Sequence, residues 1–183
     1  DFCLSRGLGD VYKRQVFLVI PSIYERSNMM SNITVYNVIE LGVNNLLADY
    51  DNWNIEEVLD KETQHFPNTL HWQYGHVLTI FEQALSLGNQ HVVDVEKYNK
   101  LFGYGSNPRD WKGQDVPAIN EIKQHIQTLP ERAKKLTHEQ LAQKLDQPIA
   151  GCNTLDELLM LNAIHVPLHT GKIEEMTRVL REK

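Results

Sequence analysis

The chain has few cysteines and no long apolar segment, and each absence excludes a class of protein. Its 183 residues contain two cysteines, too few for the disulfide framework of a small secreted domain. A reducing compartment, the cytoplasm, is therefore expected. The apolar run at residues 16–20 is far too short to cross a bilayer. We therefore expect neither a transmembrane segment nor a membrane partner.

An excess of basic residues is also lacking. The chain carries 18 lysines and arginines against 24 aspartates and glutamates, a net charge of −6. This balance argues against a broad basic face, so nucleic acid is not an expected partner. Apolar residues make up 42% and charged residues 23%, which is typical of a soluble globular domain. Eight histidines against two cysteines indicate that any metal would be held by nitrogen.

The first 29 residues differ from the rest of the chain. Residues 1–15 show no helical period and no alternation, and the string GDVYKRQ within them resembles translated sequencing adaptor. Residues 25–27 can be encoded as a bacterial ribosome-binding site placed just before Met29 and Met30. We expect residues 1–29 to be a disordered, non-native leader and residues 30–183 to be the domain; a genuine N-terminal extension is the alternative. The domain alone carries 14 basic and 21 acidic residues and one cysteine, Cys152.

Hydrophobic periodicity predicts four long helices and no run of strands. They are expected at about 31–49, 68–87, 117–135 with a kink at Pro130, and 154–180. The last begins at Thr154-Leu155-Asp156-Glu157, a capping-box sequence. Short helices are expected near residues 55–59 and, after a second capping box, near residues 137–145. These elements indicate an all-α fold, a four-helix bundle with a long connection between helices 2 and 3.

The long connection, residues 89–116, holds an aromatic cluster. A connection of this length is usually functional or packs as a unit of its own. Its aromatic residues either anchor the connection on the domain or form a lid over a site, and we favour the anchor. They are Tyr98, Phe102, Tyr104 and Trp111.

His165 and His169 are the first candidates for chemistry. They are four residues apart on the fourth predicted helix, so their side chains project from one face. At 100° per residue they share a stripe with Leu158, Leu161, Leu168 and Met176, which predicts the core face. Such a pair can supply two of the three protein ligands of an open catalytic zinc site. The alternative is that each imidazole bonds a neighbouring helix.

A third ligand has to come from another helix. His76 lies away from the main apolar stripe of the second predicted helix, but Trp72 and Ile80 flank it, so this helix can be apolar on two faces. His71 lies nearer the main stripe and is the rival ligand. Periodicity does not choose between the two.

Taken together, the two histidine segments resemble the DinB/YfiT-like family. Residues 162–180, with the two histidines followed by Gly171-Lys172-Ile173, resemble the family's last helix, in which Gly-Gln-Ile follows His-x3-His. Residues 69–82, with Gly75-His76, resemble its second helix, which carries one histidine. Residues 98–117 resemble its connection to the third helix, so the resemblance covers the chain from Met30 onward.

The resemblance implies an up-down-down-up four-helix bundle with one divalent metal ion on three histidines. The matching residues here are His76, His165 and His169. Zinc is the expected ion, with nickel, iron and manganese as alternatives. Two departures bear on the site. Lys172 stands where the family usually has glutamine, and Pro167 lies between two ligands, where it removes a backbone hydrogen bond and is expected to bend the helix.

An open three-histidine ion permits two reactions. It can lower the pKa of bound water for hydrolysis, or bind a thiol as thiolate and deliver it as nucleophile. Related family members are regarded as metal-dependent hydrolases or thiol S-transferases, including ones that use bacillithiol or mycothiol. The resemblance therefore implies a bacterial metalloenzyme with a small-molecule substrate, and a low-molecular-weight thiol is the partner considered. The alternative is a non-catalytic metal-containing bundle that binds a small molecule or dimerises.

No clean general base accompanies the three histidines. Glu82 lies roughly 120° from His76 around the helix and should not face the ion. The polar residues of the first predicted helix, Asn37, Glu40 and Asn44, are interpreted as a solvated face. No catalytic residue is therefore assigned.

Two other reactive or charged groups have plain interpretations. Cys152 precedes the last predicted helix and is interpreted as a small loop residue rather than a catalytic thiol. The basic residues Arg132, Lys134 and Lys135 are expected to complement the C-terminal end of the third predicted helix.

Overall fold

The structure of the protein is a computed structural model that describes residues 23–182, with side chains from Thr34 onward. Two compact units divide the chain, residues 1–32 and residues 33–183, and everything below concerns the second. Within the described residues no helix is long and apolar enough to cross a membrane. The expected leader, residues 1–29, lies mostly outside the described residues and stays a prediction.

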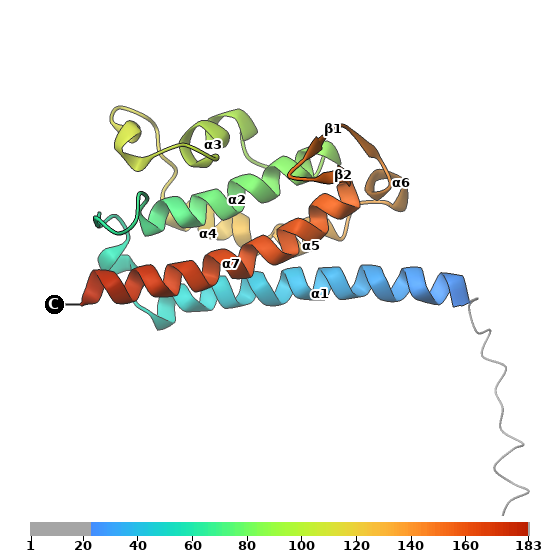
Figure 1. Cartoon of the computed structure of the whole chain (residues 1–183), viewed down its shortest axis with the longest axis horizontal. Coiled ribbons are helices and arrows are strands. Elements are labelled where there is room, and N and C mark those ends of the chain that lie inside the picture. The colour runs from blue at the N-terminus through green and yellow to red at the C-terminus, as the bar shows by residue number, and fades with distance from the viewer. Residues whose placement is uncertain (1–22, 183) are drawn as a thin grey trace, which may run out of the picture. The chain divides into compact units, whose positions relative to one another are not determined.

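The described part of the chain is mostly helical (Figure 1). The longer helices are α1 (Ile23–Asn52), α2 (Leu70–Leu87), α4 (Ile119–Gln127) and α7 (Leu155–Arg181). Shorter ones are η2 (Ile55–Val58), α3 (Val95–Phe102), η3 (Pro108–Trp111), α5 (Leu129–Ala133) and α6 (His138–Leu141). Helix α1 begins earlier than the expected residue 31, because no glycine or proline interrupts residues 23–31.

Helix α2 is the central element of the second unit. Thr69 caps its start by accepting a hydrogen bond from the Trp72 N–H, and it ends at Gly88 as the sequence predicts. Helices α7, α3 and α4 all pack on α2, and Figure 1 shows α2 between α3 and α7. As a result 14 of its 18 residues are buried, including polar ones. This confirms that the second predicted helix is apolar on more than one face.

Helix α1 contributes one buried stripe at helical spacing, made of Ile39, Val43, Leu46 and Tyr50. Next to Val43, Gly42 faces Val166 and Pro167 of α7, where a Cβ would lie 3.4 Å from each side chain. Val38, next to Ile39, lies outside this stripe and is 41% exposed.

The third predicted helix is two helices. Helix α4 ends at Gln127 and α5 begins at Leu129, so the break falls at Thr128, before the predicted kink at Pro130. Pro130 lies in the first turn of α5, where its missing N–H costs least. Arg132 lies in the last turn of α5, as expected, and donates to the His125 carbonyl oxygen. The sequence does not predict that its guanidinium is buried and pairs with the carboxylate of Glu82 at 2.6 Å.

A small β-hairpin replaces the end of the second predicted short helix, so the expectation of no strands is wrong. Strand β1 (Lys144–Ile149) pairs antiparallel with β2 (Cys152–Thr154). The two residues between them, Ala150 and Gly151, both have positive φ (49° and 86°), as tight hairpin turns require. Ala-Gly is a weaker turn signal than Asn-Gly, and so the turn is easy to miss.

The long connection packs as a unit on α2. Tyr98 and Phe102 of α3 are buried at 3% and 0% exposure, and Trp111 packs edge-on against the Phe102 ring. The anchor interpretation is confirmed for these three residues. It is wrong for Tyr104, whose side chain is 98% exposed.

Candidate metal centre

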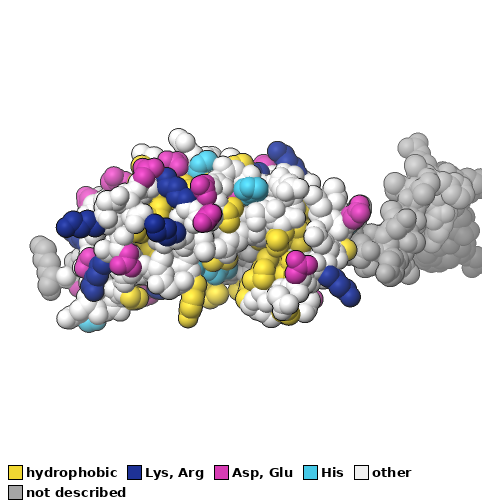
Figure 2. All heavy atoms as spheres, turned by 90° about the horizontal axis from the view of Figure 1, so that it is seen from above, with side chains coloured by type: hydrophobic (Ala, Val, Ile, Leu, Met, Phe, Trp, Pro, Cys, Tyr) yellow, Lys and Arg dark blue, Asp and Glu magenta, His cyan; other side chains and the backbone are white. Residues whose placement is uncertain are grey.

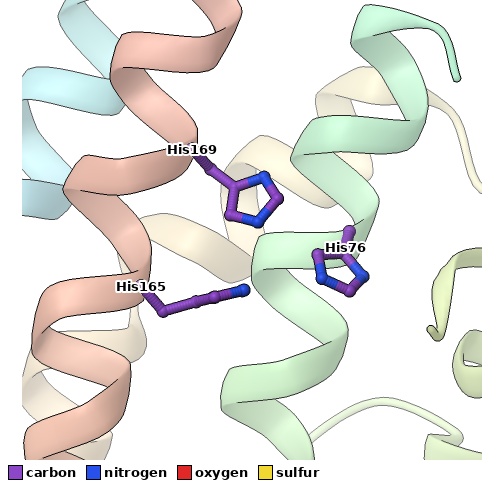
Figure 3. A group of neighbouring side chains, drawn as sticks. All are labelled: His76, His165 and His169. Carbon is purple, nitrogen blue, oxygen red and sulfur yellow. The ribbon is translucent and has the colours of Figure 1, made fainter. Parts of the chain in front are cut away.

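Three histidine side chains from two helices point toward one another (Figure 3). His76 comes from α2, and His165 and His169 from α7. Their ring centroids lie 4.4 to 5.2 Å apart, and one ring nitrogen from each lies within 4.8 Å of the other two. His76 is 7% exposed, and the other two are half-buried. The structure thus brings together the three residues that the sequence selects.

The packing of α7 on α2 sets this geometry. His165 and His169 are one turn apart, and α7 continues through Pro167 as a single helix, so both rings stay on the side facing α2. They lie at the border of the buried stripe rather than at its centre. Leu161 is partly buried, and the prediction that Leu168 faces the core is wrong, since it is 66% exposed.

Backbone and ring contacts hold His76 in place. Its Nδ1 lies 2.6 Å from the carbonyl oxygen of Phe102, so Nδ1–H donates to that oxygen and Nε2 stays free. The indole of Trp72 stacks on the imidazole at 4.5 Å. Trp72 itself donates from Nε1 to the Ser106 hydroxyl at 2.8 Å. The anchored connection therefore fixes both the position and the tautomer of His76.

A buried side-chain amide fixes the position and the tautomer of the His169 ring. Its Nδ1 lies 2.7 Å from Oε1 of Gln73, which is fully buried on α2. Donation from Nδ1–H to that oxygen again leaves Nε2 free. Histidine ligands of metals are typically oriented by such an outer hydrogen bond on the other ring nitrogen.

His165 has no such bond in the described chain. Its Nδ1 is buried without a hydrogen-bond partner, and so are Nε2 of Gln73 and Oδ1 of Asn162. Asn162 lies one turn before His165 on α7. Unpaired buried polar atoms are costly, on the order of 1–3 kcal/mol each, so the unpaired His165 Nδ1 calls for an explanation within the site.

The rival ligand His71 belongs elsewhere. Its Nδ1 lies 3.0 Å from the Asp60 carboxylate and its Nε2 lies 3.0 Å from the carbonyl oxygen of Pro117. Both ring nitrogens are engaged, and His71 is not part of the cluster. Its role is to tie the start of α2 to two loops.

The cluster favours neutral imidazoles. Burial lowers the pKa of His165 to about 4, with a further lowering by His76. Burial also lowers the pKa of His169 to about 3, helped by the other two histidines and Lys172. The pKa of His76 is lowered by burial, against the opposing effect of its bond to Phe102. Neutral imidazole is the form that coordinates metals, so the three side chains are ready ligands at neutral pH.

These residues fit a divalent ion. Tetrahedral zinc at 2.0–2.1 Å from each nitrogen needs nitrogen–nitrogen separations of about 3.4 Å. The three ring nitrogens now lie at most 4.8 Å apart, and small side-chain rotations would bring them to that separation. Two of the rings already present a free Nε2. Three protein ligands leave a fourth position for water or substrate.

No carboxylate or thiol joins the three histidines in the described chain. Glu82 is fully buried but turned away, since it pairs with Arg132 and accepts from the Val92 N–H, as expected of a residue off the site. Asn37, Glu40 and Asn44 are exposed, which confirms the solvated face. Cys152 lies in β2, and burial with the nearby Glu157 raises its thiol pKa, so it is not an activated nucleophile.

Two groups that shape the site are not evident from the sequence. Gln73 gave no signal beyond being a polar residue one turn before His76 in an apolar segment. The Phe102 carbonyl is a backbone group, so no residue type reveals it. Both became visible only once α3 and α7 were packed on α2.

No protein-family model matches the chain, and no curated protein is detectably similar to it in sequence. Function therefore has to be inferred from the site's own residues.

Proposed function

We propose that the protein is a metal-dependent enzyme in which His76, His165 and His169 hold one divalent ion, zinc first among the candidates, and which transfers a thiol to a small molecule. The observation that carries the proposal is the convergence of three imidazoles from two helices on one point, two of them oriented by a hydrogen bond on Nδ1. The spacing matches the His-x3-His helix and single-histidine helix of the DinB/YfiT-like family, and we propose membership of that family on this basis.

We also propose the family's four-helix bundle as the architecture. Its members would be α1, α2, the α4–α5 pair and α7, with α3 and η3 forming the connection between the second and third. The mutual packing of α2 with α7 and α4, and the buried stripe of α1, support this assignment.

Thiol transfer is preferred to hydrolysis because the site lacks a base. A hydrolase of the metalloprotease type places a glutamate beside the attacking water, whereas no described carboxylate joins this cluster. A divalent ion held by the three imidazoles would supply a Lewis acid able to stabilise a thiolate at neutral pH without a protein base. The protein itself positions the three histidine nitrogens and surrounds them with partly apolar, half-buried side chains.

The test is a thiol-conjugation assay with a chlorodinitrobenzene as electrophile. A carbon–sulfur bond forms as the carbon–chlorine bond breaks, chloride leaves with the electron pair, and the thiol proton passes to buffer. Metal-loaded protein is expected to accelerate the reaction for at least one of several thiols, bacillithiol among them. His165→Ala should abolish the acceleration and His71→Ala should retain it.

Equal rates for the loaded protein and His165→Ala with every thiol would overturn the transferase proposal. In that case the better account would be the non-catalytic bundle. One observation favours that second candidate, namely the exposed apolar stripe of Met160, Ile164 and Leu168 on α7, which suits association through a helix face.

A further inference from the structure

Lys172 is a cation placed beside the histidine cluster. It follows His169 by three residues and His165 by seven on α7, so all three side chains leave the helix on one side. Lys172 is half-buried, and none of the ion pairs found in the described chain involves it. Beside burial, its positive charge contributes to the lowered pKa of His169 and of His76.

The charge around the site is therefore of one sign. Neutral imidazoles contribute none, and no described carboxylate joins them. A lysine left without an acidic partner at a half-buried place retains its attraction for an anion, because nearby protein screens it less than bulk water does.

Apolar side chains share the side of α7 that carries Lys172. Leu161, His165, Leu168 and Lys172 follow one another at spacings of four, three and four, which places them on one stripe of α7. Leu168 is 66% exposed, and across the cluster the Trp72 ring covers His76. Figure 2 shows hydrophobic side chains among charged ones on one face of the molecule. A cation with an apolar border suits a molecule that has an anionic group on a short apolar body.

We propose that Lys172 is a specificity-determining residue that binds the anionic group, a carboxylate or a phosphate, of the small molecule whose reacting part lies at the three histidines. The inference rests on the proposed function for the identity of the site and adds the class of its substrate. Lysine acts here as a mobile point charge, which accepts either kind of anion.

The experiment compares Lys172→Gln and Lys172→Glu with wild type, and uses Lys135→Gln as the matched control. Lys135 is likewise a lysine with no ion pair found for it in the described chain, but it lies in the turn after α5, away from the cluster, and is exposed. Glutamine is as good a helix former as lysine, so folding should be kept, which a thermal melt checks. Calorimetry measures the binding of hexanoate, hexanamide and inorganic phosphate to the zinc-loaded and metal-free proteins.

Wild type is expected to bind hexanoate at least about tenfold more tightly than uncharged hexanamide, the size of one charge-assisted hydrogen bond at a partly exposed site. Lys172→Gln should remove that difference, and Lys172→Glu should reverse it. Lys135→Gln should behave as wild type. The ligand, hexanoate or phosphate, whose binding affinity falls more in Lys172→Gln identifies the anionic group.

Two results would overturn the inference: no preference for either anion in wild type, or the same preference in Lys172→Gln. Zinc content, measured first, separates this failure from that of the proposed function. If wild type fails to retain zinc, the metalloenzyme proposal falls. The comparison in metal-free protein still decides the role of Lys172, because its charge acts without the ion.

Discussion

At the scale of single residues, the site depends on the groups that orient the histidine rings as much as on the histidines themselves. The Phe102 carbonyl and the Gln73 amide each occupy the Nδ1 of one ring and leave its Nε2 free. Because both acceptors are buried, the rings cannot turn away without leaving a polar group unpaired.

Replacing any one of His76, His165 and His169 by alanine should abolish stoichiometric binding of a divalent ion, because two imidazoles hold such an ion far more weakly than three. His71→Ala should keep full metal content and lose some stability, since His71 only bonds Asp60 and Pro117. Metal analysis of the four purified variants decides this. Metal kept in His76→Ala but lost in His71→Ala would show that the wrong histidine of α2 had been chosen.

Gln73→Leu should weaken metal binding about 10–100-fold while the three ligands remain. The reason is that His169 loses the acceptor that orients its ring. Competition with a chelator of known affinity measures the change. Gln83→Leu on the same helix is the control, because the Gln83 amide bonds Asn99 and not a histidine. An unchanged affinity in Gln73→Leu would mean that packing alone orients His169.

At the scale of elements, α2 works as a ligand helix because other elements cover it on several sides. The sequence predicted its bounds and those of α7 well, since strong periodicity, a cap and Gly88 mark them. It also selected three histidines that the structure brings together, with the family resemblance choosing His76 over His71. Periodicity could not make that choice, because it describes one helix at a time and the covering of α2 by α3 is a tertiary event.

The elements that the sequence misjudged carry weak local signals. The hairpin turn uses Ala150 in a positive-φ conformation that alanine rarely adopts. The break between α4 and α5 falls at Thr128, whose hydroxyl bonds back to the His125 carbonyl oxygen. Arg132 was expected to complement a helix end; its partner Glu82 lies 50 residues earlier, and only packing brings the two together.

The contact between α2 and α3 gives a matched pair of glycine variants. The Phe102 ring occupies the space that a Cβ at Gly75 would need, whereas nothing lies near the corresponding position at Gly171 of α7. Gly75→Ala should lower the free energy of unfolding by about 1–3 kcal/mol, the usual cost of overpacking. Gly171→Ala should raise it by about 0.5–1 kcal/mol, since alanine favours helix. Urea unfolding measures both, and equal effects would contradict the close approach.

At the scale of the whole molecule, the buried histidines make stability depend on pH. In unfolded chains each histidine titrates near 6.5, whereas burial lowers the pKa of His165 to about 4 and that of His169 to about 3. Between these values the unfolded chain binds protons that the folded chain does not. Stability is therefore fully present above pH 6.5 and is lost as the pH falls.

The metal-free protein should accordingly lose on the order of 1 kcal/mol of unfolding free energy per pH unit for each of these histidines between pH 6 and 5. Urea unfolding in the presence of chelator, at pH 7, 6 and 5, gives the slope. His165→Phe should make it shallower, and replacement of the exposed His65 by alanine should not. A slope unchanged in His165→Phe would contradict the lowered pKa.

The distance along the chain between the candidate ligands has a consequence of its own. His76 and His165 are separated by 89 residues. An ion shared between them would act as a cross-link, and closing a loop of that length in a random chain costs about 4–5 kcal/mol of entropy. In the folded protein, helix packing already brings the two histidines together, so the ion would bind the folded protein far more tightly than the unfolded chain. Taking the ion away would then free roughly half of the polypeptide from one topological constraint, as reduction of a long-range disulfide does.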